Sequence, residues 1–125
     1  MYYNFIVKNK LKGVKMTNLI KLVNLLNKLR EKKDSLKIEL EVIKTNEYTK
    51  WKEENPKDRT AMDKVLAQLK EQNEVWKNLE EQYNYISSKY SKIKTIYDTV
   101  QSMMNSQYYS KEEIELFISS LLKGE

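Results

Sequence analysis

The most constraining feature of this chain is a run of thirteen positions that recur at alternating steps of three and four residues. All but one are apolar or aromatic: Met62, Val65, Leu69, Gln72, Trp76, Leu79, Tyr83, Ile86, Tyr90, Ile93, Tyr97, Val100 and Met104. This spacing keeps one face of an α-helix apolar and is typical of a coiled-coil seam. Because neither Gly nor Pro interrupts the run, we expect one continuous helix.

A second, leucine-rich series with heptad spacing occupies the first half of the chain. Its members are Leu19, Leu22, Leu26, Leu29, Lys33, Leu36, Leu40, Ile43 and Glu47. Thr17 stands just before it and is the expected N-cap. The only proline, Pro56, separates the two series. We expect Asn55 to cap the second helix, with Pro56 at its first position.

If the chain turns back at Pro56, facing residues have numbers that add to 112. Leu19 then lies opposite Ile93, and Leu36 lies opposite Trp76. Large rings meet leucines in this register, as dense core packing requires. We therefore predict an all-α fold, a long antiparallel two-helix coiled-coil hairpin with helix 17–54, a turn at 55–57 and helix 58–106.

A short C-terminal third helix is expected at 111–123. Ser110 and Glu113 have the spacing of a capping box, an apolar face begins at Ile114, and Gly124 suits the end of the helix. We expect this helix to fold back on the end of the long helix, near Ile96 and Ile20.

The two long helices and the third helix are expected to form a single domain, residues 17–125. Residues 1–16 are predicted to be a disordered tail or the product of a mis-assigned start, with translation beginning at Met16. Residues 11–15 could be encoded by a purine-rich ribosome-binding sequence, and the frequent Lys, Asn and Ile suggest a phage or mobile element of a low-GC bacterium. The first fifteen residues hold four lysines and no acid, so they contribute most of the net charge of +5.

The composition argues against catalysis. The chain has no His and no Cys, so it lacks the commonest general base and any thiolate metal ligand. Adjacent carboxylates such as Glu53 and Glu54 point about 100° apart on a helix and do not converge on a substrate. We expect no enzyme activity, no cofactor, no metal and no small-molecule substrate. No apolar run has the length of a membrane span, so we expect no membrane contact and a cytoplasmic location.

The function that the sequence pattern favours is protein binding. We expect a non-enzymatic helical protein–protein interaction module, an assembly factor, adaptor or inhibitor, that binds a protein partner, a second copy of itself, or both. The candidate contacts are apolar residues off the seam or beside it: Leu25, Ile38, Val42, Leu66 and Val75. Leu25 and Val75 would pair two hairpins into a four-helix arrangement. Scattered exposed apolar residues are equally compatible with an ordinary surface.

Nucleic-acid binding is the alternative. The predicted register gathers five lysines at one end: Lys21, Lys28, Lys89, Lys92 and Lys94. Beyond residue 15 the chain is nearly neutral, which falls short of a typical phosphate-tracking surface, so a nucleic-acid partner is less expected than a protein. Tyr83, Tyr90 and Tyr97 follow heptad spacing, so we expect them in the core rather than stacked on bases.

A weaker alternative comes from one family. The size from Met16 and the expected hairpin resemble the small WXG100-type secreted proteins of Gram-positive bacteria. Tyr109 and Glu113 match the C-terminal Y-x-x-x-D/E pattern of that family. The resemblance would imply a secreted helical hairpin. The chain has Trp51, Lys52 and Glu53 before its turn in place of the family's Trp-x-Gly, and one such Tyr/acid pair is expected by chance.

Overall fold

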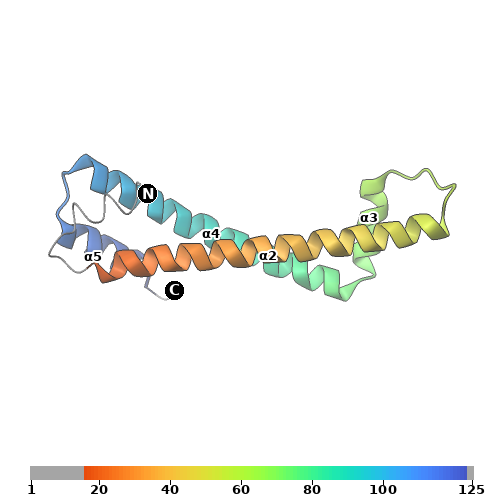
Figure 1. The fold of residues 1–125 in the computed structure, drawn as a ribbon, viewed down its shortest axis with the longest axis horizontal. Helices are drawn as coiled ribbons and strands as arrows, with labels where there is room; N and C mark the ends of the chain where they lie inside the picture. Colours follow the sequence, from red (N-terminus) through yellow and green to blue (C-terminus); the bar gives the residue numbers. More distant parts are fainter. Residues whose placement is uncertain (1–15, 124–125) are drawn as a thin grey trace. The chain divides into compact units, whose positions relative to one another are not determined.

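The computed structural model describes residues 16–123, so the predictions for residues 1–15 and for Gly124 lie outside it. Every regular element of the described part is an α-helix (Figure 1). The helices are α2 (Thr17–Glu54), α3 (Met62–Glu71), α4 (Glu74–Ser106) and α5 (Lys111–Leu121). The predicted all-α class is confirmed.

The long first helix, α2, has the same bounds as the predicted helix 17–54. It ends at Glu54 because the residue before a proline is disfavoured in helical conformation and Pro56 has no N–H to continue the ladder. Asn55 still donates its backbone N–H to Trp51 O at 2.9 Å, so it belongs to the end of α2. The prediction that Asn55 caps the second helix is therefore wrong.

The connection after α2 is longer than the predicted turn at 55–57, because α3 begins only at Met62. Asp58 explains part of the difference. Its carboxylate accepts hydrogen bonds from the Thr60 backbone N–H at 2.8 Å and from the Thr60 hydroxyl at 2.6 Å. These bonds offer the backbone an alternative to the first turn of a helix. The predicted start of the second helix at residue 58 is thus wrong.

The prediction of one unbroken second helix is also wrong, because Gln72 and Asn73 separate α3 from α4 (Figure 1). Asn73 caps α4, since its side-chain oxygen accepts the Trp76 backbone N–H at 3.0 Å. Lys70 Nζ lies 2.9 Å from Glu80 Oε1 across the break. Ten residues of straight helix would separate these positions by about 15 Å along the axis, so the chain must bend here.

The chain divides into two compact units. Unit 1 comprises Met1–Leu29 and Lys89–Glu125, and unit 2 comprises Arg30–Ser88. Helices α2 and α4 contribute to both units, whereas α3 belongs to unit 2 and α5 to unit 1.

Unit 1 holds most of the buried apolar side chains of the described residues. They are Met16, Leu19, Leu22, Leu26, Leu29, Ile93, Ile96, Val100, Met104, Ile114 and Ile118. Met16 is only 3% exposed, so the prediction that the disordered tail includes Met16 is wrong. The capping box of α5 is confirmed, with Ser110 and Glu113 bonded reciprocally. Ile96 is buried as expected, but Ile20 is 55% exposed and is not covered as predicted.

The core of unit 2 is smaller and centres on one large ring. Its buried apolar residues are Leu36, Leu40, Val65, Trp76 and Ile86. Trp76 is 1% exposed, and its indole N–H has no acceptor within the described residues. Met62, the first member of the expected seam, is 53% exposed. The seam tyrosines, Tyr83 in unit 2 and Tyr90 and Tyr97 in unit 1, are half-buried rather than core residues.

Candidate protein-binding surfaces

Unit 2 presents an apolar stripe on α2, which we call the α2 stripe. Its centre is Ile38 and Val42, one helical turn apart and 66% and 52% exposed. Lys37, Glu41, Thr45 and Asn46 line the same shallow surface. The stripe lies on α2 because Leu36 and Leu40 occupy the buried side of the helix, which leaves residues 38 and 42 on another face.

The other apolar candidates do not join this stripe. Val75 is 62% exposed in the first turn of α4, and Leu66 is half-buried on α3. Leu25 is half-buried and belongs to unit 1, so it and Val75 fall in different units. The pairing of two hairpins through Leu25 and Val75 therefore stays a prediction.

Leu25 instead lines a groove in unit 1 between α2 and α5, with a volume of about 410 Å³. We call it the α2–α5 groove. Its lining combines two leucines, two lysines and two small polar side chains: Asn18, Lys21, Leu25, Ser119, Leu122 and Lys123. No acidic residue lines the groove among the described residues. The structure thus brings Leu25 together with Lys21, two candidates that the sequence had assigned to different functions.

A carboxylate from α5 holds this groove in place. Glu115 accepts the backbone N–H of Asn18 at 3.0 Å and that of Leu19 at 2.9 Å. The Asn18 side chain donates in turn to the Glu115 backbone carbonyl at 3.3 Å. Glu115 therefore satisfies N–H groups that the start of α2 leaves without intrahelical partners. Thr17 is the first residue of α2, and the first intrahelical bond runs from Ile20 N–H to Met16 O, so the predicted role of Thr17 as N-cap is wrong.

The five candidate nucleic-acid lysines all belong to unit 1. Lys21, Lys28 and Lys92 are exposed, and Lys89 and Lys94 are half-buried. Counted over its described residues, unit 1 has seven lysines and four acidic residues, a net charge of +3, whereas unit 2 has twelve basic and thirteen acidic residues, a net charge of −1. The basic character of the chain is thus concentrated in unit 1.

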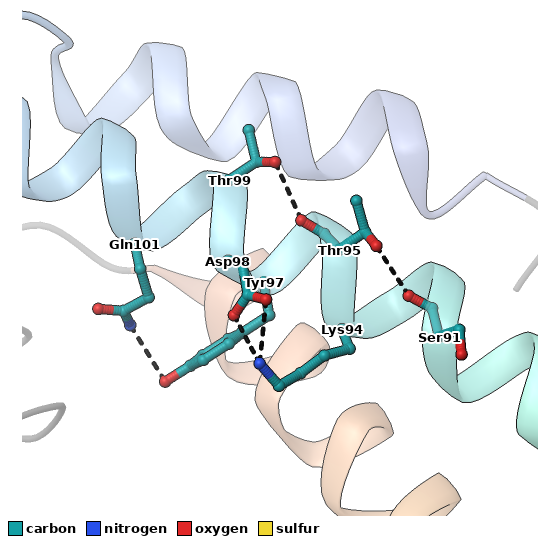
Figure 2. A network of polar contacts seen from close by, with 7 residues as sticks. All are labelled: Ser91, Lys94, Thr95, Tyr97, Asp98, Thr99 and Gln101. Atoms are coloured by element: carbon teal, nitrogen blue, oxygen red, sulfur yellow. Dashed lines mark hydrogen bonds and ion pairs between the residues drawn. The ribbon is translucent and has the colours of Figure 1, made fainter.

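Lys94 is already engaged in a polar network on α4 (Figure 2). Its ammonium group lies 2.7 Å from Asp98 Oδ1 and 3.0 Å from Asp98 Oδ2. This hydrogen bond raises the pKa of Lys94. The nearby Thr95 and Thr99 hydroxyls bond backbone carbonyls one turn back, at 3.0 Å and 2.9 Å. Lys94 therefore stays protonated. Because its charge is paired with that of Asp98, we expect Lys94 to contact a phosphate only weakly.

The Tyr109 and Glu113 pair has a local structural role. Tyr109 is 48% exposed in the connection between α4 and α5. Glu113 accepts the Ser110 backbone N–H at 3.0 Å and donates its own N–H to the Ser110 hydroxyl at 3.1 Å. The acid of the pattern shared with WXG100-type proteins thus caps α5.

Several features relevant to function had weak or no sequence signals. Glu115 accepts a hydrogen bond from Asn18, which lies 97 residues earlier in the chain, and no local sequence pattern predicts such a bond. The Asn73 cap had a usable signal, because Asn is a strong helix initiator and stands beside the only polar seam residue, Gln72.

Within residues 16–123, no cluster of three or more acidic side chains is placed to hold a metal ion. No helix among them is long and apolar enough to cross a membrane. Comparison of the chain with protein-family models, with curated proteins and with solved structures finds no match.

Proposed function

We propose that this chain is a non-enzymatic helical protein–protein interaction module whose first partner is a second copy of itself. The observation that carries the proposal is the α2 stripe, where Ile38 and Val42 stand exposed on one face of a long helix. An assembly factor, adaptor or inhibitor of a low-GC bacterium or its phage would use such a face.

The proposal includes the antiparallel coiled-coil hairpin as the scaffold of that module. In unit 1, Leu19 and Ile93 face each other in the proposed register, and both are 0% exposed. In unit 2, Leu36 and Trp76 face each other in the same register and are 6% and 1% exposed. In each unit taken separately, both members of the expected pair are buried, and this supports the proposed register.

The residues around the α2 stripe support a second copy as its occupant, because the pattern is self-complementary for antiparallel helices. Such helices pair residues whose numbers have a constant sum. Ile38 then meets Val42 of the second copy, with a sum of 80. Lys37 with Glu41, and Asp34 with Lys44 one turn further out, have a sum of 78. These charged pairs are therefore offset by two residues from the central register, about 3 Å along the helix, which long charged side chains can span. Oppositely charged side chains thus flank an apolar centre on one side, in the manner that fixes orientation in coiled coils.

Lys44 already lies 3.7 Å from Glu41 of its own helix, and Glu39 would lie opposite Glu41 of the second copy, where like charges repel. The apolar centre is also small, well below the area of a stable standard interface. We therefore expect a weak, reversible dimer, with a Kd on the order of tens of micromolar.

Sedimentation equilibrium of the full chain over a wide concentration range tests the proposal. The expected result is a monomer–dimer equilibrium that is lost in Ile38→Glu with Val42→Glu. Leu116→Glu is the matched control, because Leu116 is 71% exposed but belongs to α5 in unit 1. A strict monomer at millimolar concentration, or equal loss with Leu116→Glu, would remove the proposal.

The alternative, a nucleic-acid-associated protein, is favoured by one observation: the net charge of +3 on the described residues of unit 1. Salt-sensitive retention of the chain on DNA that disappears when Lys89, Lys92 and Lys94 are replaced by Gln would favour it. Absence of retention at low salt would exclude it.

A further inference from the structure

We infer that the α2–α5 groove of unit 1 binds an acidic amphipathic segment of a partner protein. This inference rests on the proposed function and names the chemistry of a second partner, at a different surface from the α2 stripe. Its starting point is the lining of the groove, in which an apolar pair, Leu25 and Leu122, is accompanied by Lys21 and Lys123.

Among residues 16–123, no acidic side chain pairs with the lysines at the groove. Lys21 and Lys123 are exposed, and their side chains have no ion pair or hydrogen bond with any residue between 16 and 123. Lys28, one turn beyond Leu25 on α2, is also exposed and without such a partner. Lys21, Leu25 and Lys28 follow steps of four and three, so they lie on one face of α2.

Most acidic side chains of the described part of unit 1 form hydrogen bonds or ion pairs with residues that do not carry the charge of the groove. Glu115 holds the start of α2, Asp98 holds Lys94, and Glu113 closes the capping box of α5. The groove therefore has one lysine from α2 and one just beyond the end of α5, and no carboxylate among the described residues that line it. A ligand with carboxylates on the flanks of an apolar anchor complements that arrangement.

The apolar pair distinguishes a protein segment from a phosphate backbone. Leu25 and Leu122 are half-buried and can receive one bulky side chain, as helix-in-groove complexes do with spaced apolar anchors. A nucleic acid would use the lysines but would leave both leucines without a partner. The groove also has no aromatic residue on which a base could stack.

The test measures binding of labelled probes to the full chain by fluorescence anisotropy. The first probe is a designed helical peptide with leucines at steps of three and four and glutamates on their flanks. Matched peptides replace either every Glu by Lys or every Leu by Ala. A short DNA duplex and vesicles of phosphatidylglycerol are the remaining probes. We expect salt-sensitive binding of the first peptide, and about tenfold or greater weakening with either matched peptide.

Variants then place the binding on the groove. Lys21→Glu with Lys123→Glu should weaken the first peptide about tenfold or more. Lys50→Glu with Lys57→Glu changes the net charge equally in unit 2 and should leave the affinity unchanged. Amide chemical shifts of the wild-type chain give a second measurement that does not depend on the variants folding, and they should move at Leu25 and Leu122.

Three results would overturn the inference: no binding of the acidic peptide, equal weakening by both lysine pairs, or tighter binding of DNA or vesicles than of the peptide. None of these results bears on dimerisation through the α2 stripe, which sedimentation measures independently. Conversely, a chain that is monomeric but binds the acidic peptide would contradict only the second copy as a partner.

Discussion

At the scale of single residues, Glu115 shows how one side chain can organise two helices. Its two carboxylate oxygens each accept a backbone N–H from the first turn of α2, at 3.0 Å and 2.9 Å. A carboxylate at this place accepts hydrogen bonds from N–H groups that have no partner within the helix, and its negative charge interacts favourably with the positive end of the helix dipole. Since α5 supplies the group, loss of Glu115 should weaken the start of α2 and its contact with α5 together.

Glu115→Ala should therefore lower the free energy of unfolding by about 1 kcal/mol, the usual cost of losing a helix cap. Urea denaturation followed by circular dichroism measures the loss. Glu112→Ala is the matched control, because Glu112 is exposed on the same helix and has no partner within residues 16–123. Equal losses for the two variants would show that the Glu115 bonds contribute little.

Asp58 offers a residue-scale test by titration. Hydrogen bonds from the Thr60 hydroxyl and backbone N–H hold the pKa of Asp58 below its ordinary value. A carboxyl group with a lowered pKa stabilises the fold at higher pH, and that contribution is lost as the pH falls through the folded pKa. Thr60→Val removes the hydroxyl bond, so the pKa of Asp58 measured by NMR should rise. Thr60→Ser keeps a hydroxyl and should leave it low.

At the scale of elements, the joint between α3 and α4 is where the heptad pattern failed to predict the structure. The pattern runs without interruption through Gln72, yet the chain bends there, because Asn73 caps a new helix and Lys70 reaches Glu80. Heptad periodicity indicates which face of a helix is apolar, but it does not show whether the helix is continuous. The bend is accompanied by a side-chain cap and an ion pair, which involve single positions. A heptad pattern does not identify such positions, because it reports only the spacing of apolar residues.

Asn73→Ala should lower the free energy of unfolding by about 1 kcal/mol, since it removes the cap of α4. Asn84→Ala is a control that should change the free energy of unfolding in the opposite direction. Asn84 is exposed inside α4, where Ala is the better helix former, so this change should stabilise the chain by about 0.5 kcal/mol. Thermal unfolding followed by circular dichroism distinguishes the two. A stabilising Asn73→Ala would mean that α3 and α4 merge into one helix when the cap is removed.

Elements with strong local signals were predictable, and tertiary contacts were not. The bounds of α2 follow from an uninterrupted helical sequence before Pro56, and the start of α5 follows from its capping box. The groove between these two helices could not be predicted. It depends on a bond between Glu115 and the start of α2, and the sequence gives no pattern for contacts at such separation. The α2 stripe was predictable because Ile38 and Val42 lie off the seam.

At the scale of the whole molecule, burial is uneven. Of the sixteen buried apolar side chains of the described residues, eleven belong to unit 1 and five to unit 2. Local stability follows the apolar contacts that an opening must break, so the two units should open at different free energies. Within the single helix α2, we expect amides near Leu22 to exchange with solvent more slowly than those near Ile43. Hydrogen exchange measured by NMR tests this expectation. Uniform protection along α2 would show instead that the whole chain opens as one cooperative unit.

The proposed dimer can be tested through its charges without touching its apolar centre. Lys37→Glu places like charges against Glu41 of the second copy on both sides of the twofold axis, so sedimentation equilibrium should show a weaker dimer. Lys37→Glu combined with Glu41→Lys exchanges the two charges and restores opposite signs across the interface, so dimerisation should return. Because residues 37 and 41 are also four apart on one helix, the helix content of each variant is followed by circular dichroism. Recovery of the dimer at unchanged helix content shows that residues 37 and 41 meet between copies. If the double variant dimerises no better than Lys37→Glu alone, the antiparallel register around Ile38 and Val42 is wrong.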